Sequence, residues 1–372
     1  MCLIVARQLL VMAIIVVVSF FFSRRNKFGQ KESMFLSRIL LYVINPCMIA
    51  STFDVEFSGQ KLKSLGLAIG VSFAFHLVMI VIAMVLFAKK KASYAQDARG
   101  GDCVQAQEAG RAENHAQAKE ARDSLSKIGI VFTNSGFIGI PLINGVFGSA
   151  GVFYLMGYIL VFNVLLWTWG EWLMTGTMRP AKILANPNVL ACAAGLAIFC
   201  LPFKIPYVII EPIKMIGACN GAVSMMLLGL LFASFGGAKE KGSQGQEGGN
   251  ENCGQDQKRA DENSLKAQKS AASAKAFAKP LARDVALRLL LCPVVLLFAT
   301  LFALRVFSSV DEIKLIMSVL FIAAACPVGM SVSSFAVVFK KDADYASLLV
   351  ALSSAACVVT VPLLVALLEA LV

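Results

Sequence analysis

Residues 132–145 read FTNSGFIGIPLING, and residues 325–335 read ACPVGMSVSSF. Each stretch lies inside an apolar run and carries a proline near its middle, with glycines beside it. Proline removes a backbone donor and clashes with the preceding helical turn, and glycine lowers the cost of leaving helical geometry. The two stretches therefore predict two broken helices, in which new half-helices start at Pro141 and at Pro327.

The composition around these stretches is typical of a membrane protein. Of the 372 residues, 58% are hydrophobic and 15% are charged, whereas soluble domains have roughly 45–50% and about 25%. The apolar runs of about 20 residues are long enough, as helices, to cross about 30 Å of hydrocarbon. The sequence predicts an all-α polytopic bundle with ten transmembrane helices. They lie near residues 3–22, 34–53, 65–88, 127–148, 151–174, 183–202, 207–235, 284–306, 312–339 and 344–371.

Ten spans divide into two halves of five. An odd number per half starts the second half on the opposite side of the membrane, which makes an inverted repeat. Residues 1–174 are predicted to form the first five-helix repeat and residues 175–372 the second. Secondary transporters built in this way hold their substrate near the midplane, between interrupted helices of the two halves. We therefore expect helices four and nine to cross at the binding site.

The broken helices favour an anion as the bound species. The start of a half-helix presents N–H groups without intrahelical partners and the positive end of the helix dipole. Two such ends near the bilayer centre predict an anion site, because non-helical backbone there must line a cavity or be buried in protein. The alternative is a pair of kinked structural helices, since proline is frequent in membrane spans. The matched pattern in both halves, with Asn and Ser nearby, favours the site.

The positive charge of the chain is explained by topology. Most of the 34 Lys and Arg residues fall in segments that would be cytoplasmic if the N-terminus lies outside. The positive-inside rule then predicts that both termini lie outside, in a multi-pass protein of the cell (inner or plasma) membrane. The net charge of +11 therefore does not indicate a nucleic-acid partner.

Two of the predicted cytoplasmic segments have the composition of linkers. Residues 92–124 and 238–276 are rich in Ala, Gln, Glu, Lys and Gly and contain hardly any apolar residues that could form a core. Such segments are predicted to be disordered. The alternative is that their short basic runs contact anionic lipid or a regulator.

Several motifs are missing from the sequence. The ten cysteines form no C-x-x-C pair, and neither H-E-x-x-H nor G-x-S-x-G occurs. The sequence therefore predicts no enzyme, no cofactor and no metal site. No aspartate lies at mid-span, which disfavours an exchanger based on carboxylates. His76 is the only imidazole in a predicted span, and we expect a packed, hydrogen-bonded histidine rather than a proton carrier.

Motifs from nearly all ten spans are similar to those of one known family. They are INPCMI at 44–49, NSGFIGIPL at 134–142 with FG at 147–148, NP at 186–187, NGAVSMMLLG at 220–229, Pro327 with FA at 335–336, DYAS at 344–347 and TVPL at 360–363. With these motifs the chain resembles the auxin efflux carrier family, which includes plant PIN carriers and bacterial carriers of malate or malonate.

The resemblance implies a crossover of helices four and nine that holds a carboxylate, and an elevator-like motion. Helices one, two, six and seven would form a scaffold, and helices three to five and eight to ten would move. Asn134, Pro141 and Pro327 take the site role by motif match, and the other candidates are added by position. The full predicted substrate-binding set is Asn45, Asn134, Ser135, Gly136, Pro141, Asn144, Asn163, Pro327, Gly329, Ser331 and Ser333.

Together these patterns predict a secondary-active efflux carrier or permease for a small organic anion. The alternative is a membrane sensor that binds an organic acid without transporting it and signals through residues 236–283. The expected partners are the organic acid and the lipid bilayer. A homodimer and coupling to H⁺ or Na⁺ are left open. Plant members place a long loop between helices five and six, but here that link is only residues 175–184, which favours a bacterial-type carrier.

Overall fold

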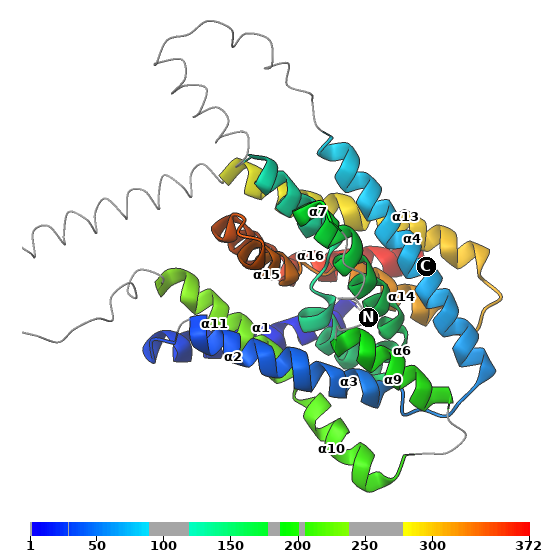
Figure 1. Cartoon of the computed structure of the whole chain (residues 1–372). Coiled ribbons are helices and arrows are strands. Elements are labelled where there is room, and N and C mark those ends of the chain that lie inside the picture. The colour runs from blue at the N-terminus through cyan, green and yellow to red at the C-terminus, as the bar shows by residue number, and fades with distance from the viewer. Residues whose placement is uncertain (1, 29, 89–118, 178–186, 201–204, 238–277) are drawn as a thin grey trace, which may run out of the picture.

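The computed structural model describes residues 2–28, 30–88, 119–177, 187–200, 205–237 and 278–372, and nearly all of them form helices (Figure 1). Seven helices are long and apolar enough to cross a membrane. Within the described ranges, β-structure is limited to one isolated antiparallel bridge, between Thr133 and Val328. The predicted helical, multi-pass architecture is confirmed. The seven helices span Cys2–Arg25, Glu32–Thr52, Gly59–Leu86, Ser135–Thr175, Tyr207–Ala233, Ala278–Val306 and Asp344–Leu371.

Several helices in the first part of the chain contain a π-helical turn, which accommodates one extra residue. These turns join shorter α-helices end to end, so that one predicted span comprises two or three elements. The elements are α1 (Cys2–Arg25), α2 (Gln30–Ile39), η1 (Leu40–Ile44), α3 (Asn45–Thr52), α4 (Gly59–Leu86), a helix at 119–131, η2 (Ser135–Gly139), α6 (Ile140–Leu165), η3 (Leu166–Gly170) and α7 (Glu171–Thr175).

The predicted boundary between spans four and five coincides with a kink at Gly148. α6 runs through both spans, and its direction changes at Gly148, whose φ is 64° and ψ is −158°. Glycine adopts this left-handed φ without the steric cost that a side chain would add. Residues 140–147 and 149–165 are therefore two differently directed parts of one element.

The remaining elements follow the predicted spans, with two spans divided and one extended. The span predicted at 312–339 is divided at its predicted break. α10 and α11 divide the predicted span at 207–235, and the span predicted at 284–306 begins earlier, at Ala278. The elements are α9 (Pro187–Cys200), α10 (Tyr207–Ala218), α11 (Asn220–Gly237), a helix at 278–286, η4 (Leu287–Leu291), α13 (Cys292–Val306), α14 (Ile313–Ala325), α15 (Ser331–Val338) and α16 (Ala343–Leu371).

The helices pack in two groups. In the first, α1 packs against α11, and α3 packs against α9 and α10. In the second, α6 packs against α4 and α14, α14 against α13, and α15 against α16. Figure 1 shows α1, α2, α3 and α11 together, with α4 and α13 on the opposite side. The groups meet where α1 contacts α16 and where α11 contacts η2.

Each of the two predicted breaks is present, but the helices restart at other residues. The helix at 119–131 ends before Phe132, and helical backbone resumes at Ser135, well before Pro141. Pro141 is the second residue of α6 and directly follows the π-helical turn, where the hydrogen-bond register of the helix changes, so its missing N–H is tolerated there. The second break follows α14, and α15 begins at Ser331, after Pro327.

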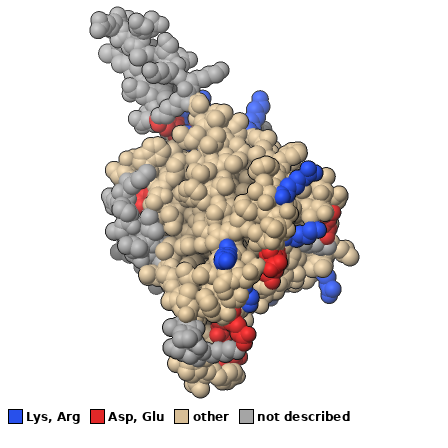
Figure 2. Space-filling model, turned by 90° about the vertical axis from the view of Figure 1, so that its right-hand side faces the viewer, with Lys and Arg blue, Asp and Glu red and all other residues tan. Residues whose placement is uncertain are grey.

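The two predicted linkers lie mainly outside the described residues, which exclude 89–118 and 238–277. Residues 119–124, which the sequence assigns to the first linker, are described and form the first turns of the helix at 119–131. On the face of the molecule in Figure 2, basic and acidic side chains lie among uncharged ones. Large apolar side chains are exposed along the long helices, among them Leu10 of α1, Val81 of α4 and Phe298 of α13, as expected for contact with hydrocarbon.

Candidate functional site

The two breaks lie side by side and share backbone hydrogen bonds. The N–H of Asn134 donates to the carbonyl of Pro327 at 2.8 Å, and the N–H of Gly329 donates to the carbonyl of Phe132 at 2.9 Å. These bonds flank the antiparallel bridge described above. Backbone N–H and C=O groups that have no partner within a helix are thus hydrogen-bonded between the two breaks, as a low-dielectric environment requires.

The close approach depends on a glycine in the second break. A Cβ atom placed on Gly329 would lie 2.8 Å from the carbonyl oxygen of Thr133 and 3.0 Å from that of Phe132. Real Cβ atoms rarely approach backbone oxygens so closely, and neither oxygen is on a flexible side chain. Gly329, a residue of the predicted set, therefore sets how near the two breaks come.

Polar side chains at the breaks are buried without partners. Asn134 is 2% exposed, and among the described residues neither its Nδ2 nor its Oδ1 has a hydrogen-bond partner. The buried Oγ atoms of Ser135 and Ser331 also have no partner in the described part of the chain. Buried polar groups in folded proteins are nearly always satisfied. The cluster therefore points to a ligand or to water that completes its hydrogen bonds.

Helix starts supply further donors to the same place. Ser135 is the first residue of η2, which continues into α6, and Ser331 is the first residue of α15. The first turn of a helix carries N–H groups that have no intrahelical acceptor. Free side-chain donors and helix starts thus converge at the pair of breaks, although the helices begin at these serines and not at the prolines.

A second polar pair lies on the first group of helices. Asn45, at the start of α3, accepts a hydrogen bond of 2.5 Å from Nδ2 of Asn220, at the start of α11. Both residues are buried, and the Oδ1 of Asn220 has no partner within the described ranges. Asn45 was predicted as a site residue, whereas Asn220 appeared only as the first residue of the family motif at 220–229.

Apolar side chains join this pair to the breaks. Phe137 of η2 and Met330 of the second break both pack on a buried cluster that contains Ile44 and Leu227. A Cβ atom on Gly221 would lie 3.3 Å from Cβ of Pro141. The breaks therefore face the first group of helices, at the boundary between the two groups.

A cavity of about 360 Å³ lies at the same boundary. Residues of α1, α11 and α16 line it, and it reaches Ile138 of η2. Its walls are apolar apart from Ser354, whose Oγ is buried and has no partner among the described residues. The cavity opens to the surface of the molecule, where Val17 and Phe21 of its lining are exposed.

Arg288 is the residue at the breaks that the sequence analysis missed. It lies in η4, and its side chain is fully buried. Its Nη1 donates to the carbonyl of Ile130 at 2.8 Å, and its Nη2 and Nε donate to that of Cys326 at 2.7 and 3.1 Å. Nη2 also donates to the carbonyl of Ala324. A cation among helix carboxyl-terminal carbonyls is electrostatically favourable.

The sequence did contain a signal for this arginine. The predicted span at 284–306 placed Arg288 near one end of a helix, among the charges that determine topology. However, apolar residues flank it on both sides, in VALRLLLCP at 285–293. An arginine inside an apolar run is costly in a membrane and therefore marks a functional or structural role.

The other predicted residues have separate places. Gly136 has open space where a Cβ would lie, and Ser333 is half-buried on α15. Asn144 is exposed, and Asn163 donates to the carbonyl of Ile159 at 2.8 Å within its own helix. The structure thus brings the residues of the two breaks together with Pro141, and Asn45 lies on the neighbouring group of helices. Asn144 and Asn163 are not part of the cluster of unpartnered polar groups.

His76 packs beside the first break. Its Nδ1 is 2.8 Å from the carbonyl oxygen of Ser72, and its ring centroid is 4.7 Å from that of Tyr158. The Tyr158 hydroxyl is in turn 3.4 Å from Oγ1 of Thr133. The histidine is thus packed and has one hydrogen bond, as expected, but its Nε2 is buried without a partner among the described residues.

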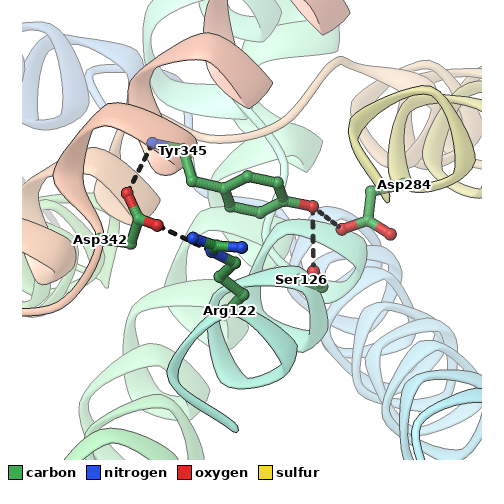
Figure 3. A network of polar contacts seen from close by, with 5 residues as sticks. All are labelled: Arg122, Ser126, Asp284, Asp342 and Tyr345. Carbon is green, nitrogen blue, oxygen red and sulfur yellow. Dashed lines mark hydrogen bonds and ion pairs between the residues drawn. The ribbon is translucent and has the colours of Figure 1, made fainter. Parts of the chain in front are cut away.

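A second polar network joins three helices of the second group (Figure 3). Arg122 pairs with Asp342 at 2.8 Å, and Asp342 caps α16 by accepting from the N–H of Tyr345 at 3.1 Å. The Tyr345 hydroxyl donates to the buried Asp284 at 2.5 Å and lies 3.4 Å from Oγ of Ser126. Through these contacts Tyr345 links α16 to the helices at 119–131 and 278–286.

No metal centre is found in the part of the chain that the structure describes. Groups of three or more His, Cys, Asp or Glu side chains that could hold an ion do not occur in these ranges. The polar groups at the breaks are amide, hydroxyl and backbone N–H groups instead. The N–H and O–H groups among them can donate to an anion or to a neutral polar molecule.

Comparison with known proteins agrees with this architecture. The family described as membrane transport protein matches residues 172–365, slightly more than half of the chain. The matched region contains the second break, Arg288 and most of α16. A search of the curated proteins finds no match to the chain. The resemblance to the auxin efflux carrier family is confirmed, and the chain belongs to the membrane transport protein family as a multi-pass membrane protein.

Proposed function

We propose that this protein is a secondary-active carrier of a small organic anion, a carboxylate, which binds at the paired breaks. The observation that carries the proposal is Asn134, which is 2% exposed and has both polar side-chain atoms without a partner among the described residues. The hydroxyls of Ser135 and Ser331 and the two helix starts supply donors around it. A carboxylate accepts several hydrogen bonds at once and matches Nδ2 of Asn134, the hydroxyls and the N–H groups, whereas Oδ1 of Asn134 would accept from a water molecule beside it.

The proposed mechanism is elevator-type alternating access. It rests on a ten-helix bundle with a five-plus-five inverted repeat, in which the broken fourth and ninth helices cross. Supporting this, the breaks belong to one group of packed helices, whereas Asn45 and Asn220 belong to the other. A displacement of one group past the other would carry the breaks from one side of the membrane to the other.

The proposed topology places both termini outside the cell, in the inner or plasma membrane. The bilayer and the organic acid are the proposed partners, and transport rather than catalysis is the proposed activity. A homodimer and coupling to H⁺ or Na⁺ are further proposals. The family to which the chain belongs and the apolar surface of its helices support a carrier, and the gradients are varied in the experiment that follows.

The test is uptake into proteoliposomes of labelled malate, malonate, lactate and indole acetate, with and without Na⁺ or H⁺ gradients. We expect saturable uptake of at least one acid by the unaltered protein. Asn134→Ala should abolish it, because the acid loses an amide that nothing else satisfies. The matched control is Asn144→Ala, which removes an exposed amide from α6 and should leave uptake unchanged.

Each other outcome has a defined meaning. If Asn134→Ala is monodisperse and transports as well as the unaltered protein, the paired breaks are not the substrate site. If an acid binds with saturation but no flux occurs under any gradient, the sensor alternative replaces the carrier. If no acid binds at all, the carboxylate class is wrong.

A further inference from the structure

Paired breaks create an electrostatic problem for an anion site. Each break joins the carboxyl-terminal end of one helix to the amino-terminal end of the next. A helix end carries about half an elementary charge, negative at the carboxyl terminus and positive at the amino terminus. Two negative and two positive ends therefore meet in the same region. Without another charge their fields would largely cancel, and the pair would have little preference for an anion.

Arg288 lies on the negative ends only. Its guanidinium donates to the carbonyl of Ile130, at the end of the helix at 119–131, and to those of Ala324 and Cys326, at the end of α14. Both breaks thus receive hydrogen bonds from one side chain. The positive ends, which begin at Ser135 and Ser331, carry the unpartnered hydroxyls instead. The cation and the polar cluster therefore act on opposite ends of the same breaks.

The charge of Arg288 is not cancelled by an acid. The side chain is 0% exposed, and among the described residues no carboxylate forms an ion pair with it. A charge in a dry interior is screened much less than one at the surface. Arginine also suits this position better than lysine, because its planar fork offers five donors and can serve carbonyls of two helices at once.

We propose that Arg288 determines the charge selectivity of the paired breaks, so that they bind an anion in preference to a neutral molecule of the same shape. The inference rests on the proposed function and identifies Arg288 as the residue that makes the carrier select an anion. Arg288 does not touch the substrate in this account. It is a positioning residue that holds both breaks in place and offsets their negative ends, which leaves the positive ends to dominate the field at Asn134.

The test compares each acid with its own carboxamide, which has nearly the same shape and no charge. The probes are malate, malonate, lactate and indole acetate and the corresponding amides, used as competitors of labelled acid in proteoliposomes. In the unaltered protein we expect the acid to compete at least about tenfold better than the amide. Arg288→Gln should reduce this preference about tenfold, because glutamine can still donate to a carbonyl but carries no charge.

Two further variants separate charge from structure. Arg288→Lys keeps the charge and should keep most of the preference for the acid, even if its overall affinity falls. Arg283→Met is the matched control, since Arg283 lies one turn earlier in the same helix and its Nε bonds Asp284 at 2.8 Å, not the breaks. The Arg283→Met variant should prefer the acid over the amide as strongly as the unaltered protein does.

The outcomes separate this inference from the proposed function. If the unaltered protein transports an acid but does not distinguish it from the amide, the inference fails and the carrier stands. If Arg288→Gln keeps the full preference for the acid over the amide, the inference also fails and the carrier stands. If neutral variants never fold whereas Arg288→Lys does, Arg288 is only a structural clamp and the inference is overturned. If no acid is bound by the unaltered protein, the proposed function fails first.

Discussion

At the scale of single residues, the site is defined by groups that lack partners. Asn134, Ser135 and Ser331 were predictable because proline and glycine mark the breaks and polar residues stand beside them. Arg288 was not recognised because its role depends on carbonyls about 40 or more residues away in either direction. Sequence patterns identify residues that disturb a helix, but they do not show which distant backbone atoms a side chain reaches.

Gly329→Ala should destabilise the protein and abolish uptake. The added methyl group would meet the carbonyl oxygens of Thr133 and Phe132 at 2.8 and 3.0 Å, so the breaks must separate and lose shared hydrogen bonds. We expect a cost of roughly 1–3 kcal/mol, seen as a lower thermal midpoint in detergent. Gly136→Ala is the control, because nothing lies within 4 Å of its added Cβ. Equal midpoints for the two variants would contradict the close approach.

At the scale of elements, composition predicted where long apolar helices lie but not where they restart. The boundary predicted after residue 148 coincides with the kink at Gly148, whose φ is 64°. The helix at 119–131 begins earlier than predicted, because its charged first turns resemble the linker that precedes them. Pro141 was expected to start a half-helix, and the π-helical turn at Ser135–Gly139 takes that place.

The network around Tyr345 is expected to stabilise this arrangement of elements. Tyr345→Phe removes the hydroxyl that donates to the buried Asp284 at 2.5 Å and leaves a carboxylate oxygen without that donor. The expected loss is about 1–3 kcal/mol of stability, with the site itself intact. Thermal unfolding in detergent measures it. Tyr207→Phe, at a side chain that is 72% exposed, should have no effect, and a similar result for both would assign the network no role in stability.

At the scale of the whole molecule, the two packed groups of helices make the proposed motion testable. A Cβ on Gly145 of α6 would lie 2.4 Å from Cδ of Gln8 of α1, so a cysteine pair at these positions joins the groups. In a background without the native cysteines, oxidation of Gln8→Cys/Gly145→Cys should stop uptake, and a reductant should restore it. The measurement is uptake before and after reduction.

The control pair lies within one group. Nε2 of Gln60 is 2.7 Å from Oδ2 of Asp311. Gln60 lies in the first turn of α4, and Asp311 lies just before α14, so both belong to the second group. Cross-linked Gln60→Cys/Asp311→Cys should transport normally, since these parts move together. Uptake that survives the first cross-link, or is lost with the second, would contradict a rigid displacement of one group against the other.

The shared hydrogen bonds of the two breaks also constrain biosynthesis. The ribosome delivers the amino-terminal part of the chain first, so the carbonyl of Phe132 and the N–H of Asn134 exist before Gly329 and Pro327, their partners in the finished protein. Bare backbone groups are not tolerated in hydrocarbon. Until the last helices are inserted, the backbone groups of the first break must therefore be hydrogen-bonded to water or to another protein, such as the insertion machinery.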